Sequence, residues 1–167
     1  CCTLPSEDEV AKAIVDLQKV PDPIKIYKAH KALRIEMGKS GQHIFTKVYQ
    51  NHIIKGEYSS SEIDCGHRAL TNLALHYISL SDNGTLAQQQ FKNANNMTQQ
   101  LSALGNLLKT GNGKQAVANF YKQWQHERLV VDKWFSIQVT SCDPENAVML
   151  TTKLLKHPEF TLKNPNR

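Results

Sequence analysis

Two aromatic-rich segments separated by a short polar turn constrain this chain more than any other part of its sequence. They lie within residues 119–138, N-F-Y-K-Q-W-Q-H-E-R-L-V-V-D-K-W-F-S-I-Q. The large side chains of each segment recur at helical spacing and share one helix face: Phe120, Tyr121 and Trp124 in the first, and Val131, Trp134, Phe135 and Gln138 in the second. The turn Gln125–Leu129 predicts two antiparallel helices that bury their rings in a shared core, where aromatics contribute much apolar area.

The length and composition of the chain indicate one soluble domain. A chain of 167 residues normally forms a single domain that buries roughly 70% of the surface exposed on unfolding. An apolar share of 40% and a charged share of 21% are ordinary for a globular protein. No stretch approaches the roughly 18 apolar residues of a membrane helix, and Cys1–Pro5 lacks the pattern of a signal peptide. Without an initiator Met, and ending on Asn164–Arg167, the chain is expected to be a piece of a longer protein.

The four cysteines do not form the pattern of a disulfide framework. Cys1 and Cys2 are adjacent, whereas Cys65 and Cys142 stand alone inside helical patterns. A domain of this size needs no disulfide, so we expect free, buried thiols in a reducing compartment, that is, the cytoplasm. The chain contains no C-x-x-C or H-x-x-x-H pair, and the spacing therefore predicts no zinc site.

A net charge of +5 and a pI near 9.0 raise the question of a nucleic-acid partner. The basic residues are densest on one side of a single predicted helix, at Lys25, Lys28, Lys31 and Arg34, with His30 among them. The other side of this helix carries Ile26, Ala29, Leu33 and Met37, a pattern typical of a solvated outer face over a core. No glycine-framed aromatic motif accompanies the charge, so we expect no nucleic acid.

The remaining patterns predict helices with short breaks. Ser6 and Glu9 form a capping box that opens a helix to about Val20. Asp22 and Pro23 start a second helix, which fades near residues 38–41. The third is expected to end at Gly56 and to turn inward Ile44, Val48 and Ile53. Ser59–Ser61 cap a fourth whose predicted apolar face is Ile63, Leu70, Leu73, Ala74, Tyr77 and Ile78.

The second half of the chain continues in the same way. A short helix over Leu86–Lys92 is followed by one that begins after Asn96 and stops at residues 110–113. After the aromatic pair of helices, Asp143-Pro144 starts a last helix that His157-Pro158 breaks. No strand alternation occurs, so the fold class is all-α, and local patterns leave open whether the helices form a bundle or a stacked solenoid.

No residue pattern predicts catalysis. None of the seven histidines belongs to an H-E-x-x-H motif, which would place two imidazoles on one helix face. A nucleophile elbow, a P-loop and a dinucleotide-binding glycine cluster are also missing from the sequence. Cys65 and His67 lie two residues apart and so point to different sides of their helix. We therefore predict neither catalytic nor metal-binding residues in this chain.

One stretch closely resembles a known family. Residues 129–138, L-V-V-D-K-W-F-S-I-Q, resemble the D-K-W-F-x-x-Q segment near the end of aminopeptidase N of the bacterial, plant and protist kind, and Phe120-Tyr121-x-x-Trp124 precedes them in register. Four further stretches match in the same order: Thr3-Leu4-Pro5-Ser6-Glu7, Arg68-Ala69-Leu70-x-Asn72-Leu73, Ala94-x-Asn96-Met97-Thr98, and His157-Pro158-x-Phe160-x-Leu162-x-Asn164-Pro165-Asn166-Arg167. The matches cover nearly the whole chain.

The resemblance implies a fold and a function. Members of that family are four-domain, zinc-dependent aminopeptidases whose final domain is an armadillo- or HEAT-like superhelix of paired antiparallel helices that caps the catalytic cleft. Residues 1–167 are then a single helical domain, the larger N-terminal part of that final domain. The implied partners are the catalytic domain of the same polypeptide and its short peptide substrates. Zinc belongs to the parent's catalytic domain, and this chain contains neither its ligands nor the amine-binding motif.

The same resemblance nominates only three residues near a substrate path. Asn164, Asn166 and Arg167 stand where the family's substrate-channel contacts from this domain begin. Their alternative role is an Asn-Pro turn that caps a following helix. A competing hypothesis for the whole chain is a freestanding helical-repeat scaffold that binds protein or RNA.

Overall fold

A computed structural model describes residues 4–163 of this chain. Within that range the chain forms nine α-helices and no strand. They are α1 Glu7–Asp16, α2 Pro23–Ser40, α3 Gln42–Asn51, α4 Glu62–Asp82, α5 Thr85–Asn93, α6 Met97–Lys109, α7 Lys114–Trp124, α8 Arg128–Thr140 and α9 Pro144–Leu154. The predicted all-α class is confirmed.

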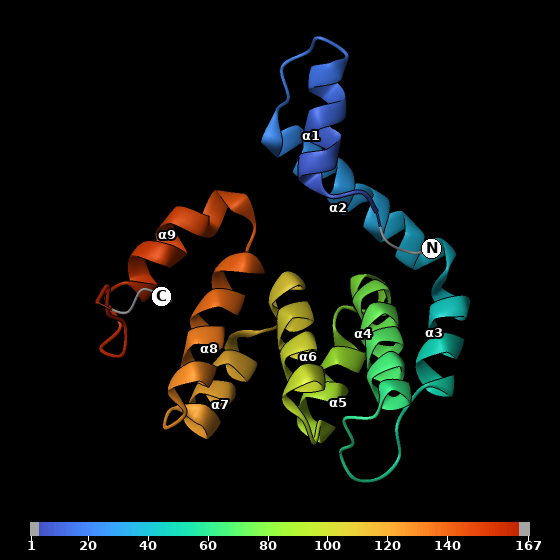
Figure 1. Ribbon diagram of the computed structural model, residues 1–167, viewed down its shortest axis with the longest axis vertical. Helices are drawn as coiled ribbons and strands as arrows, with labels where there is room; N and C mark the ends of the chain where they lie inside the picture. Colours follow the sequence, from blue (N-terminus) through green and yellow to red (C-terminus); the bar gives the residue numbers. More distant parts are fainter. Residues whose placement is uncertain (1–3, 164–167) are drawn as a thin grey trace.

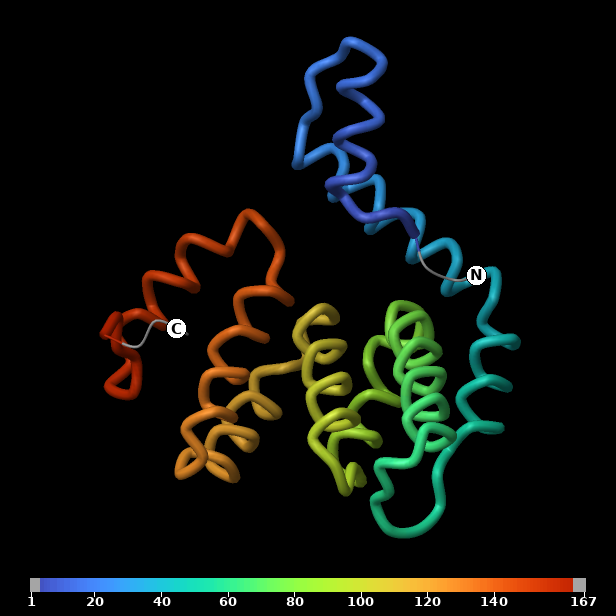
Figure 2. The backbone as a smooth tube through the Cα atoms, viewed as in Figure 1, coloured from blue at the N-terminus to red at the C-terminus, as the bar shows by residue number. Residues whose placement is uncertain are grey.

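The helices stack in pairs along one direction. Figure 1 shows α4, α6 and α8 side by side, with α5 and α7 behind them, and α3–α4, α5–α6 and α7–α8 pack against each other. Figure 2 traces the chain as an arc in which α1–α2 and α9 approach each other from opposite ends of this row. Stacked pairs rather than a closed bundle give the predicted superhelix.

Local chemistry sets where several helices begin. The Ser6 hydroxyl accepts from the Glu9 amide, and the Glu9 carboxylate accepts from the Ser6 amide, which completes the predicted capping box. Asp22 caps α2 through the amides of the next turn, and the Asn96 side chain caps α6. The end of α1 was predicted wrongly, because it ends at Asp16 rather than near Val20.

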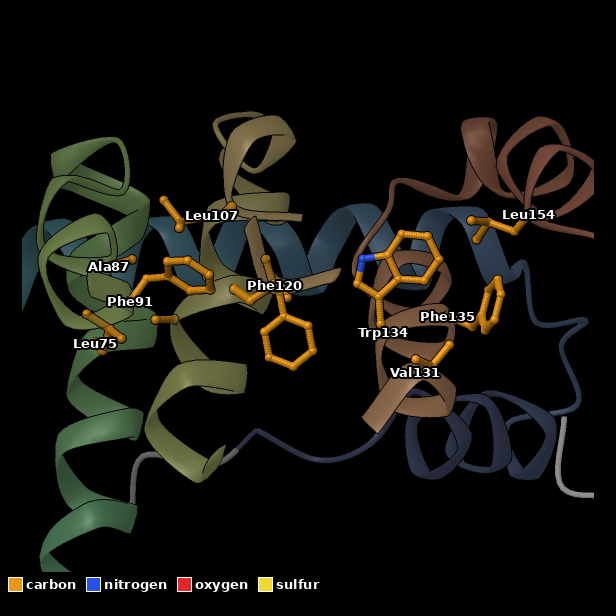
Figure 3. Packing of buried hydrophobic residues seen from close by; sticks show 12 residues of the cluster. Leu75, Ala87, Phe91, Leu107, Phe120, Val131, Trp134, Phe135 and Leu154 are labelled. Atoms are coloured by element: carbon orange, nitrogen blue, oxygen red, sulfur yellow. The ribbon is translucent and has the colours of Figure 1, made fainter. Parts of the chain in front are cut away.

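The main core follows the row of helices from α4 to α9 (Figure 3). Its most enclosed large side chain is Phe120, which has no exposed surface. The two helices around the predicted turn do share this core: Trp134 and Phe135 are buried in it, and Trp124 packs against it. A second, smaller cluster joins α3 to α4, where the Phe45 and Tyr77 rings stack with their centroids 4.4 Å apart.

Several predicted inward residues are in fact exposed. On α3, Phe45 is buried and Ile44 is 53% exposed, because the helix meets α4 through a face one residue further on. The other predicted core residues that are exposed are Ile53, Ile63, Leu70, Ala29 and Leu33. At these positions helical periodicity did not predict which face the neighbouring helices cover.

A glycine lets α2 approach α4 closely. A Cβ atom on Gly38 would lie 2.6 Å from the Tyr77 carbonyl oxygen, too close for any other residue without a shift of the helices. This contact seats α2 across the row, and so it positions the α2 side chains described below.

Candidate functional site

The three nominated substrate-path residues, Asn164, Asn166 and Arg167, lie outside the described residues, so their role stays a prediction. The histidines and cysteines within the described part form no group of three or more potential metal ligands with acidic residues. We therefore derive no chemical step through zinc from these residues. In the same range, no helix is both long and apolar enough to cross a membrane.

The large aromatic residues of the matching segment at residues 120–138 lie in or against the core. The Trp134 ring meets Tyr121, Phe135 and His157 at centroid distances of 4.9, 5.0 and 5.3 Å. Its indole Nε1 donates to the Val117 carbonyl at 3.0 Å. The chain folds back after α9, so that His157 and Phe160 both pack on Phe135. This motif therefore builds an aromatic cluster, and its geometry indicates packing rather than chemistry.

A second matching stretch anchors a loop. Arg68 is buried, and its guanidinium donates to the Ser59 carbonyl at 2.8 Å and to the Cys65 sulfur at 3.0 Å. It also lies over the Tyr58 ring, 4.9 Å from the centroid. The guanidinium thus holds the loop before α4 in place. Cys65 is free, as predicted, but exposed rather than buried.

The sequence predicted that the basic side of α2 faces solvent. In the structure, part of this side contacts acidic residues at the start of α9. The Tyr27 hydroxyl and the Lys31 ammonium group both donate to Asp143 Oδ1, at 2.7 and 2.6 Å. Lys28 lies 4.0 Å from Glu145. We call these five residues the polar strap, because they join α2 to the start of α9 across the gap between the two ends of the arc. Residues so far apart in sequence gave no local signal of this pairing.

The strap shifts the pKa values of its own groups. The Lys31 hydrogen bond, then that of Tyr27, lowers the pKa of Asp143 below its ordinary 3.8. Burial, followed by the hydrogen bond to Asp143, raises the pKa of Tyr27 to about 12. At neutral pH, Asp143 is therefore ionised and accepts both hydrogen bonds, and Tyr27 keeps the proton that it donates.

Beside the strap lies a pocket of about 190 Å³. Side chains from the last turns of α4 and α6, from the end of α8 and from α2 line it, and the strap closes one side. The pocket wall also carries three basic groups from three helices: Arg34, His76 and Lys109. No local sequence pattern predicts this cluster, because each residue is isolated on its own helix and only the packing brings them together.

The basic groups affect one another. Burial lowers the pKa of His76, and the charges of Lys109 and Arg34 lower it further. Desolvation of the ammonium group also lowers the pKa of Lys109, with Arg34 adding to the shift, although part of this side chain is exposed. Like charges brought together in this way favour the neutral forms. The pocket therefore gathers basic groups from three helices at one place.

Comparison with known proteins identifies the class of this domain. The chain belongs to the family described as "Domain of unknown function (DUF3458_C) ARM repeats", whose model matches residues 1–167. Armadillo repeats are the stacked helical units seen in the structure.

Particular relatives are aminopeptidases. The chain is 36% identical to aminopeptidase N of Haemophilus influenzae and 33% identical to that of Escherichia coli, over 99% of its own length in both cases. It is 30% identical to aminopeptidase N of Caulobacter vibrioides over 98% of its length. The chain spans about a fifth (19%) of the length of these relatives. The crystal structure of Legionella pneumophila aminopeptidase A in complex with aspartic acid matches with a TM-score of 0.80 and 24% identity, over 99% of this chain and 20% of that one.

Proposed function

We propose that this chain is the C-terminal, non-catalytic domain of a zinc-dependent aminopeptidase N that removes N-terminal amino acids from peptides. The observation that carries the proposal is similarity to aminopeptidase N along 98–99% of the chain, which corresponds to 19% of each relative. Zinc and the catalytic groups then belong to the catalytic domain of the same polypeptide. Residues 1–167 form one helical unit, the larger N-terminal part of that final domain.

Within the parent enzyme, the domain caps the catalytic cleft and restricts access to short peptides. An arc of paired helices supports this role, because such a superhelix offers an extended curved wall rather than a site of its own. The motif residues are used for packing, as expected of a wall. The parent enzyme acts in the cytoplasm, in keeping with the free Cys65 and Cys142.

The proposal is tested in the full-length aminopeptidase that carries this chain. The ratio of kcat/KM for a long peptide to kcat/KM for an aminoacyl anilide is measured with and without residues 1–167. A cap that excludes large substrates predicts that this ratio rises by about tenfold or more when the domain is removed, a change of about 1.4 kcal/mol in relative barrier. Zinc content serves as the control, since equal content shows that the catalytic domain stays folded. An unchanged ratio at equal zinc content would contradict the capping role.

A further inference from the structure

Two of the three basic groups in the pocket wall have no carboxylate partner among the described residues. Arg34 and Lys109 form no ion pair within the described residues, where the ion pairs involve other lysines. The pocket wall contains two acidic residues. Asp143 already accepts hydrogen bonds from Lys31 and Tyr27. The charge of Glu7 contributes to the raised pKa of Tyr27. Arg34 is half-buried, and a half-buried charge without a partner is costly.

The ends of the surrounding helices do not explain these charges. Basic side chains often stabilise the free carbonyl groups in a last helical turn. At the end of α6, however, the carbonyls of Asn106, Leu107 and Leu108 already accept from the amides of the following turn. The Leu107 carbonyl also accepts from the Thr110 hydroxyl. Lys109 is therefore not needed as a cap, and its ammonium group remains available to a ligand.

The orientation of His76 makes its second nitrogen available as well. Its Nδ1 lies 3.1 Å from the Asn106 side-chain oxygen, and the Asn106 amide nitrogen donates to the Ser102 carbonyl. Because this arrangement makes the Asn106 oxygen an acceptor, Nδ1 carries the proton of the neutral ring. Nε2 is then the atom that gains a proton when a negative charge arrives.

We propose that this pocket binds an oxyanion, the charged group of a carboxylate or of inorganic phosphate, between Arg34, His76 and Lys109. The planar guanidinium fork matches two oxygens of such a group, and the ammonium and imidazolium groups donate to the others. The volume of about 190 Å³ admits a small molecule but no folded partner. The inference is independent of the capping role, since it uses only groups inside this chain.

Proton uptake by His76 gives the proposal a direct signature. Lys109, Arg34 and the Asn106 side chain face the ring, and Glu7, Tyr27, Lys31, Cys142 and Asp143 line the rest of the pocket. A bound anion neutralises the two nearby cations and favours imidazolium. The His76 pKa, followed by NMR of the 167-residue chain, is therefore expected to rise on addition of phosphate or succinate. Sodium chloride at matched ionic strength screens the two cations and is expected to raise the His76 pKa less than either anion does.

Variants that remove one charge give a second test of the proposal. Calorimetric titration with phosphate and with succinate is expected to show saturable binding that Arg34→Gln and Lys109→Gln each weaken about tenfold or more. Lys92→Gln removes the same charge from an exposed site in the last turn of α5, outside the pocket, and should change the affinity less than about twofold. The tighter of the two probes identifies the ligand as a phosphate or a carboxylate.

Two results would overturn the proposal. One is a His76 pKa that rises no more at saturating phosphate and succinate than in sodium chloride of the same ionic strength, a measurement that needs no variant to fold. The other is an equal loss of affinity in Lys92→Gln, which would assign binding to the overall charge of the chain.

Discussion

The two ends of the arc are held by different kinds of interaction. Towards the C-terminal end, Phe120, Trp134 and Phe135 are buried in the main hydrophobic core, and the aromatic cluster around Trp134 and Phe135 forms part of this core. At the N-terminal end, α1 buries no residue and packs on α2, while Val15 and Leu17 are 55% and 69% exposed. The N-terminal end packs on the row of helices through the contacts of α2 with α3 and α4. The polar strap joins the same end to the start of α9. The difference predicts that the cluster sets global stability and that α1 moves separately from it.

The largest effect is expected from the main hydrophobic core, of which the aromatic cluster is part. Phe120→Ala removes a side chain with no exposed surface, and should lower the free energy of unfolding by about 3–5 kcal/mol because it leaves a cavity in the shared core. Urea unfolding measures the change. Val15→Ala on the exposed side of α1 is the matched control and should change stability by less than about 0.5 kcal/mol. Equal losses at both positions would remove the distinction between the two ends.

A smaller effect is expected where α2 crosses α4. Gly38→Ala places a methyl group 2.6 Å from the Tyr77 carbonyl oxygen, and should cost about 1–3 kcal/mol by forcing the helices apart. Gly66→Ala is the control on α4 itself, since no atom lies within 4 Å of its Cβ position. There alanine should stabilise the helix by up to about 1 kcal/mol. Thermal unfolding measures both changes in stability, a loss for Gly38→Ala and a gain for Gly66→Ala. A stabilised Gly38→Ala variant would show that the close approach of α2 and α4 is not required.

The smallest change in stability is expected from the strap. Asp143→Asn weakens contacts that are half-exposed, so it should cost no more than about 1 kcal/mol. The radius of gyration from small-angle scattering should nevertheless increase, because these contacts hold the two ends together. Asp16→Asn, on exposed α1, removes the same charge without an ion pair in the described residues. A radius that grows equally in both variants would contradict the role of the strap.

The pH dependence of the strap follows from its two shifted groups. The pKa of Asp143 is lowered on folding, so its contribution is present above its ordinary pKa of 3.8 and is lost as the pH falls through the lowered value. The pKa of Tyr27 is raised, so its contribution is complete below 10.0 and is lost as the pH rises through about 12. The radius of gyration is therefore expected to stay constant between these limits and to grow outside them.

Local signals in the sequence predicted the helices well and their faces less well. Ser6, Asp22 and Asn96 marked helix starts correctly. An N-cap side chain accepts hydrogen bonds from amides of the first helical turn, so the signal is local in the sequence. On α3, the choice between Ile44 and Phe45 as the buried residue depended on where α4 lies. That position follows from tertiary packing rather than from the periodicity of α3.

The candidate site was beyond sequence analysis for a similar reason. Arg34 was assigned to a solvated face of α2, and neither His76 nor Lys109 stood in a recognisable motif. The pocket exists only because Gly38 seats α2 against α4 and because α4 and α6 end on the same side of the row. The aromatic motif, in contrast, was visible because its residues lie within one hairpin.

Hydrogen exchange of the backbone amides tests the contrast between the two ends most directly. In this account, the aromatic cluster sets global stability and the strap stabilises only the N-terminal end. Amides of α7 and α8 should then exchange through global unfolding, and amides of α1 should exchange at least about a hundredfold faster. Asp143→Asn should speed exchange in α1 and α2 without affecting α8. Uniform protection from α1 to α8 would contradict the account.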